Sequence, residues 1–98
     1  MNLRWTEQAL ARLREIREYV SAHDALAADR LVEKLIRRAE VLRRFPRMGR
    51  RIPELPAADL RELIERNYRL VYRVRKRTVE VLTVFEGHRL FPTEDVER

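Results

Sequence analysis

The chain has 98 residues, of which 45% are hydrophobic, and its formal net charge at pH 7 is +6. This length suits one domain with a single modest core, and no apolar run approaches the ~18 residues of a membrane-spanning helix. With no cysteine and only two histidines, His23 and His88, a disulfide framework and a metal site are excluded, so we expect no cofactor. Residues 1–5 lack a secretory signal, so we expect a cytoplasmic protein with no membrane contact.

The charge indicates the kind of partner. Twenty of the 22 basic residues are arginine, whose planar guanidinium suits bidentate contact with phosphate or carboxylate. Arginine enrichment also arises from a G+C-rich genome, and composition does not separate the two explanations. A net positive charge nevertheless favours a negatively charged partner.

The amino-terminal half predicts one short strand and two helices. Residues 2–5 would place alternate apolar side chains on one face, and Thr6 is a good N-cap for a helix that ends near Ser21. A second apolar stripe of helical period spans residues 28–45 and stops at Pro46. Two amphipathic helices with so short a connection predict an antiparallel hairpin. The aromatic residues on these stripes are expected in the core: Trp5, Tyr19 and Phe45.

The carboxyl-terminal half predicts strands. A loop rich in proline and glycine covers residues 46–59, and strand-like segments follow at 60–66, 68–75 and 78–86. The last of these is apolar on both faces, which is typical of a strand covered on both sides. Gly87 ends it, and residues 90–98 are expected to form a weakly ordered tail.

Together these elements predict an α+β fold in the order β-α-α-β-β-β, a single domain over residues 1–98. The helical hairpin should pack on a small twisted antiparallel sheet. In the middle strand, alternation separates an apolar and tyrosine face, which the helices should cover, from a face with Arg69, Val71 and Arg73.

Arg69 and Arg73 are the first candidate site residues. A guanidinium held on a rigid strand is what phosphate or carboxylate recognition requires. Spacing supports equally well that they pair with Glu62 or Glu80 on neighbouring strands. The basic residues of the following turn, 75–77, are interpreted as a solvated cluster.

His88 and Arg89 follow Gly87, and a bend there would gather them with Arg69. Such a set could cleave RNA: a carboxylate, Glu54 or Glu62, would act as base on the 2′-hydroxyl, and His88 would protonate the leaving oxygen. A lone histidine at a strand end more commonly makes a structural hydrogen bond.

Several segments, in this order, resemble the RelE/ParE toxins over nearly the whole chain. They are Trp5-Thr6, Pro46-Arg47-Met48-Gly49-Arg50, Leu60-Arg61-Glu62-Leu63, Tyr68-Arg69-Leu70-Val71-Tyr72 and Gly87-His88-Arg89. The resemblance implies a helical hairpin on an antiparallel sheet. It also implies the toxin of a type II toxin-antitoxin system, held inactive in a hetero-oligomer by an antitoxin that an adjacent gene encodes.

The family divides on mechanism. RelE-like members cleave messenger RNA on the ribosome, and Arg69 and His88 match positions that serve them, whereas Arg89 stands where some have tyrosine. ParE-like members poison DNA gyrase without nuclease activity, and the central motifs resemble this branch and plasmid stabilisation proteins slightly more. A non-enzymatic nucleic-acid-binding module and an inactive family member are the alternatives. The expected target contacts are Arg50, Arg61, Arg69, Arg73 and Arg89.

Overall fold

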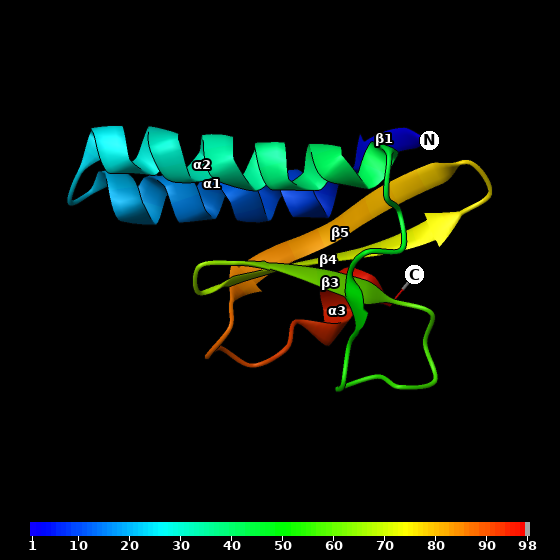
Figure 1. Ribbon diagram of the computed structural model, residues 1–98. Coiled ribbons are helices and arrows are strands. Elements are labelled where there is room, and N and C mark those ends of the chain that lie inside the picture. The colour runs from blue at the N-terminus through cyan, green and yellow to red at the C-terminus, as the bar shows by residue number, and fades with distance from the viewer. Residues whose placement is uncertain (98) are drawn as a thin grey trace.

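The computed structural model describes residues 1–97, which form a helical hairpin above a five-stranded sheet (Figure 1). Arg98, the last residue of the expected tail, lies outside the described residues. The predicted α+β class is confirmed. In chain order the elements are β1 (Asn2–Trp5), α1 (Glu7–Ser21), α2 (Ala25–Glu40), the 3-10 turn η1 (Val41–Arg43), β2 (Arg50–Arg51), β3 (Arg61–Glu65), β4 (Tyr68–Arg75), β5 (Thr78–Glu86) and α3 (Thr93–Val96).

Side-chain caps begin both long helices. The Thr6 hydroxyl accepts a hydrogen bond from Ala9 N–H at 3.1 Å, and the Asp24 carboxylate accepts one from Ala27 N–H at 3.0 Å. Each cap satisfies an N–H that has no partner in the first helical turn, a contribution of about 1 kcal/mol. The predicted start of the first helix is confirmed. Among the described residues, no helix has the length and apolar character needed to cross a membrane.

The second helix ends earlier than predicted. α2 stops at Glu40 and the chain tightens into η1, so the last residues of the predicted stripe leave the helix before Pro46. Phe45 is 53% exposed and lies under the Arg44 guanidinium, and Tyr19 on α1 is 62% exposed. The expectation that Tyr19 and Phe45 lie in the core was wrong, because Tyr19 lines a surface groove and Phe45 follows the end of η1.

The sheet has the strand order β1-β5-β4-β3-β2. The predicted antiparallel meander of β3, β4 and β5 is confirmed, with Glu62 opposite Val71 and Arg69 opposite Phe85. β1 pairs with the other edge of β5 and runs parallel to it. The sheet is therefore mixed and not wholly antiparallel. A strand that leads into helices is free to enter parallel to its neighbour, because no hairpin turn sets its direction.

The sheet is apolar on both faces and separates two cores. As predicted, the helices cover the face that carries Tyr68, Leu70 and Tyr72. On the other face Val71, Leu82 and Phe85 pack against Ile52, Leu60 and Val96. The loop before β3 and the carboxyl-terminal segment supply this second cover. The two-sided apolar pattern of β5 is explained by it.

The carboxyl-terminal segment is not the weakly ordered tail expected from its sequence. Asp95 in α3 has 1% of its side chain exposed, and it accepts hydrogen bonds from Arg12 Nε at 2.7 Å and from the Thr83 hydroxyl at 2.8 Å. A buried carboxylate is tolerated only when it is paired and hydrogen-bonded. These contacts fasten α3 to α1 and β5. The sequence pattern assigned Arg12 to solvent because its partner lies at the far end of the chain.

Gly49 anchors the long loop between η1 and β3. Its N–H donates to the buried Tyr72 hydroxyl at 2.9 Å, and Arg61 donates to its carbonyl oxygen at 2.7 Å. A Cβ on Gly49 would lie 2.6 Å from the Glu62 carbonyl oxygen and 2.6 Å from the Tyr72 hydroxyl. Only glycine lets the loop approach the sheet this closely.

We expect Gly49→Ala to lower the free energy of unfolding by about 2–3 kcal/mol, because the added methyl overlaps a backbone carbonyl of β3. Gly87→Ala is the matched control. Its Cβ would meet its nearest neighbours at 3.4 and 3.5 Å, ordinary contact distances, and its φ is not positive. A change within about 0.5 kcal/mol is expected there. Urea denaturation followed by circular dichroism measures both, and equal losses would contradict the packing argument.

Candidate functional site

Arg69 is the centre of the candidate site. It lies on β4, on the face away from the helices, and its side chain is 11% exposed. Its Nε donates to Glu62 at 2.5 Å, and its two terminal nitrogens donate to the two carboxylate oxygens of Glu54 at 2.6 and 2.8 Å. Bidentate contacts of this type are among the strongest between side chains. Two carboxylates therefore already occupy the guanidinium.

Two aromatic rings cover the Arg69 guanidinium. Its central carbon lies 5.0 Å from the ring centroid of Phe85 and 5.6 Å from that of Phe91, both within cation–π range. The hydrogen bonds to Glu54 raise the pKa of Arg69 above its ordinary value, against the opposing effect of burial. The same contact lowers the pKa of Glu54. Both groups are thus held in their charged forms.

Glu62 is the most buried member of this set, with none of its side chain exposed. Its second carboxylate oxygen accepts a hydrogen bond from Arg50 Nε at 2.6 Å, and Arg50 lies opposite Glu62 in the pairing of β2 with β3. We name Arg50, Glu54, Glu62 and Arg69 the Arg69 network. The Glu62 carboxylate joins β2, β3 and β4, and Arg69 adds Glu54 of the loop that follows β2.

Arg73 is engaged in the same way. Its Nε donates to Glu80 at 2.7 Å, and Arg4 of β1 forms an ion pair with the same carboxylate. The hydrogen bonds from Arg4 and then from Arg73 lower the pKa of Glu80. The sequence left open whether Arg69 and Arg73 are free to bind a ligand or pair with neighbouring carboxylates. The structure shows the pairing, of Arg69 with Glu62 and of Arg73 with Glu80.

Arg50 and Arg61 were expected to contact a target, and both hold the loop before β3. Arg50 binds Glu62, as described above. Arg61 donates to the carbonyl oxygens of Gly49 at 2.7 Å and Arg47 at 3.3 Å. Arg50 Nε and Arg61 Nη1 therefore donate within the protein and not to a target molecule.

Arg69, His88 and Arg89 are not brought together. The chain turns after Gly87, and the His88 side chain is 72% exposed, with Nδ1 3.9 Å from the Glu86 carboxylate. Arg89 is 61% exposed and its Nε lies 3.5 Å from the same carboxylate. Within residues 1–97, neither side chain forms a hydrogen bond or ion pair with the Arg69 network. The predicted bend leaves both side chains on the surface.

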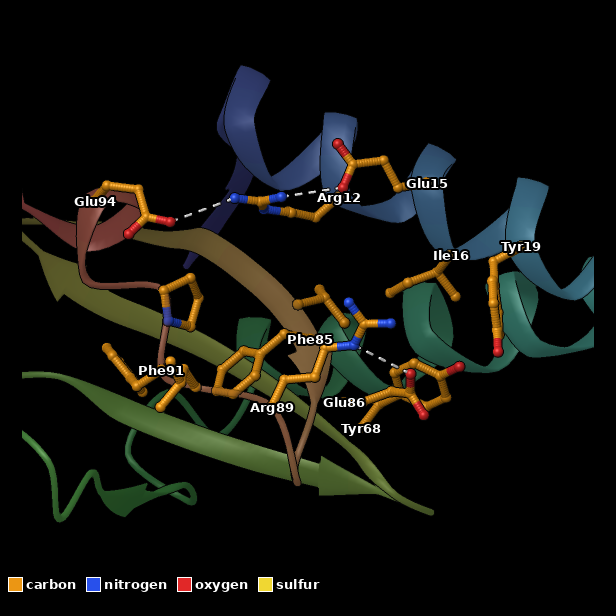
Figure 2. A pocket seen from close by; sticks show the side chains of 13 residues that line it. Arg12, Glu15, Ile16, Tyr19, Tyr68, Phe85, Glu86, Arg89, Phe91 and Glu94 are labelled. Carbon is orange, nitrogen blue, oxygen red and sulfur yellow. Dashed lines mark hydrogen bonds and ion pairs between the residues drawn. The ribbon is translucent and has the colours of Figure 1, made fainter.

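A groove of about 560 Å³ runs between α1 and the chain from Val84 to Glu94 (Figure 2). Ile16 and Tyr19 line it from α1, and Phe85 and Phe91 line it from β5 and the segment that follows. β1 pairs with β5 only as far as Val81, so the adjoining backbone edge of β5 has no strand partner in the described part of the chain. The groove combines apolar walls with charged rims, which suits an amphipathic segment of another protein.

Phe85, Phe91 and Asp95 are structural members of the site that the sequence did not reveal. Phe85 and Phe91 line the groove and also stack on Arg69, so they form the wall between the two. The only sequence feature that pointed to them was the apolar pattern on both faces of β5. This pattern predicts a second cover, but it does not show that the carboxyl-terminal segment provides it. In residues 1–97, no three histidine, cysteine or acidic side chains come together as a metal site would need.

Residues 3–91 match the family model described as the ParE toxin of the type II toxin-antitoxin system, parDE. The chain therefore belongs to the ParE toxin family, and the resemblance drawn from its motifs is confirmed.

Individual relatives agree. The chain is 38% identical over 95 residues to Y4kP of Sinorhizobium fredii (strain NBRC 101917 / NGR234), a protein named as a toxin, with 92% of each chain covered. It is 42% identical over 60 residues to the toxin RelE2 of Caulobacter vibrioides, covering 61% of this chain and 64% of that one. A solved structure titled chromosomal ParDE TA system from P. aeruginosa superposes with a TM-score of 0.72. That match covers 88% of this chain and 95% of the other at 24% identity, so it shows the fold alone.

We expect acid to destabilise this protein through Glu54 and Glu80. Because both pKa values are lowered in the folded state, the paired carboxylates stabilise the fold above the ordinary glutamate pKa of 4.5. This contribution is lost as the pH falls through the still lower folded values. Urea denaturation at neutral pH and below pH 4.5 should show a smaller acid loss in Glu54→Gln/Glu80→Gln, which starts less stable. Parallel pH curves would refute the assignment.

Arg69→Ala is expected to lower the free energy of unfolding by about 3 kcal/mol, because it removes one partner of the fully buried Glu62. Arg14→Ala is the control, since Arg14 is exposed on α1 and should change stability by less than about 0.5 kcal/mol. Thermal and urea denaturation measure the difference. If the two variants are equally stable, the Arg69 network does not support the fold.

Proposed function

We propose that this toxin inhibits growth in the ParE manner, by poisoning DNA gyrase in the cytoplasm, and does not cleave messenger RNA. The observation that carries the proposal is the state of Arg69. Its guanidinium is 11% exposed, contacts two carboxylates and is stacked on two rings. A ribonuclease needs such an arginine free to hold the scissile phosphate.

The candidate proton-transfer groups, Glu54, Glu62 and His88, also favour a mechanism without RNA cleavage. A general base works best with a pKa near the working pH, and the Arg69 contact lowers that of Glu54. Glu62 is wholly buried and bound to two arginines. His88, the candidate acid, contacts Glu86 and is separate from the network. None of these residues is arranged to share one phosphate.

A second candidate is RelE-like, ribosome-dependent cleavage of messenger RNA. The identity to a protein named toxin RelE2 supports it, although that match covers 61% of this chain. It would require Glu54 to leave Arg69 on the ribosome. The family model that matches residues 3–91 bears the ParE name and supports the first candidate.

Membership of a toxin-antitoxin family supports an antitoxin as partner, and we place part of it in the groove beside α1. Leu90 at the groove is 95% exposed, and Tyr19 opposite is 62% exposed. Apolar side chains so exposed in a groove favour an occupant with apolar side chains of its own. The unpaired edge of β5 adds backbone donors and acceptors for an extended segment.

Expression of the chain alone should stop bacterial growth, and co-expression of a small protein from the adjacent reading frame should restore it. His88→Ala should remain fully toxic, induce a DNA-damage reporter and leave transcripts uncut in primer extension. The control is Arg14→Ala, which alters an exposed arginine remote from these groups. New transcript ends that disappear in His88→Ala would establish the RelE-like mechanism. Unaffected growth and no binding partner would indicate a nucleic-acid-binding module or an inactive family member.

A further inference from the structure

A cluster of basic residues lies beyond the ion-paired arginines of β4, in the turn that follows this strand. On the Arg69 face of the sheet, Arg50, Arg69 and Arg73 all contact carboxylates. The turn between β4 and β5 is different, because it carries three consecutive exposed basic side chains without an ion-pair partner in residues 1–97. We name this turn the basic tip, and its residues are Arg75, Lys76 and Arg77.

Further positive groups are fixed beside the basic tip. The backbone N–H of Asn2 donates to the Arg77 carbonyl oxygen at 2.9 Å, and the Met1 amino group donates to the Arg43 carbonyl oxygen at 3.0 Å. Through these two bonds β1 holds η1 next to the turn. Arg43 and its exposed neighbour Arg44 therefore share this end of the molecule with the basic tip.

The carboxylates of this end do not neutralise the basic tip. Glu40 pairs with Arg43, and Glu80 pairs with Arg4 and Arg73. Asp59, which lines a surface hollow together with Arg75, pairs with Arg51 at 3.5 Å. The charge of the basic tip itself is therefore unpaired within residues 1–97. A surface of this kind attracts a polyanion over a range set by the ionic strength.

Lys76 adopts the left-handed backbone region, with φ 59°. Glycine or asparagine would occupy this position with less strain, so the lysine is kept there at a conformational cost. Arg66 in the β3–β4 turn has a similar φ of 57° but lies outside this cluster. Substitution at Arg66 can therefore serve as the control for the same substitution at Lys76.

The basic tip projects from the molecule. In Figure 1 the β4–β5 turn extends past β1 and past the end of the helical layer, so no other element shields it. Duplex DNA carries one negative charge per about 1.7 Å of its axis, and its major groove is wide enough for a two-stranded ribbon. We propose that the basic tip, with Arg44 beside it, binds the phosphate backbone of double-stranded DNA.

Fluorescence anisotropy with a labelled duplex of about 20 base pairs tests the proposal, at salt concentrations from about 50 to 200 mM. Lys76→Glu/Arg77→Glu should weaken binding at least about tenfold and reduce the magnitude of the log–log salt slope by about 2, because each lost phosphate contact removes about 0.9. The control is Arg30→Glu/Lys34→Glu, the same charge change at exposed positions of α2. Equal weakening by both pairs, or by neither, overturns the proposal.

A second pair of variants separates binding from folding. Lys76→Gly and Arg66→Gly each remove one positive charge and relax one left-handed residue. Both should melt at the wild-type temperature or above it. Only Lys76→Gly should weaken DNA binding, by about threefold or more. Equal DNA affinity of the two variants contradicts a local role for the tip.

Two further probes test the nature of the ligand. An RNA duplex of the same sequence has a deep, narrow major groove that side chains cannot enter, so tighter binding to RNA than to DNA overturns the proposal. The same result follows if Lys76→Glu/Arg77→Glu loses antitoxin rescue and keeps DNA binding. Growth arrest and rescue are separate readouts from anisotropy, so a failure of the toxin function is distinguishable from a failure of the basic tip.

Discussion

Glu62 places a carboxylate inside the protein with none of its side chain exposed, and such a charge is stable only when it is fully paired. Arg50 and Arg69 provide that pairing, one from β2 and one from β4. Arg69 in turn binds Glu54 on the loop. The path of the loop across the sheet thus follows from one buried charge, and the second core closes beneath it.

Because of this constraint, the arginines beside Glu62 have a structural role in addition to any role in binding. All three guanidinium nitrogens of Arg69 contact carboxylates, so Arg69 cannot bind a phosphate without weakening its contact with Glu54 or with the buried Glu62, which is costly. Arg69 is therefore part of the architecture of the fold, and Arg73 stabilises it through Glu80. The basic tip carries unpaired charge because its residues extend beyond the carboxylates that neutralise the sheet.

Phe85 and Phe91 connect the two functional surfaces of the carboxyl-terminal half. One side of this aromatic pair stacks on the Arg69 guanidinium, and the other lines the groove beside α1. The Arg12–Asp95 ion pair holds the segment that carries Phe91 in place. The same two rings therefore border both the groove and the Arg69 network.

The sequence by itself determined the helical hairpin, the three-stranded meander and the family, because these depend on local periodicity, caps and turns. The alternation in β4 correctly separated Tyr72 from Arg69. Which carboxylate each arginine meets, the parallel entry of β1 and the burial of Asp95 were decided only by the tertiary structure. Asp95 meets Arg12 across nearly the whole chain, and no local pattern encodes a pairing between residues so far apart.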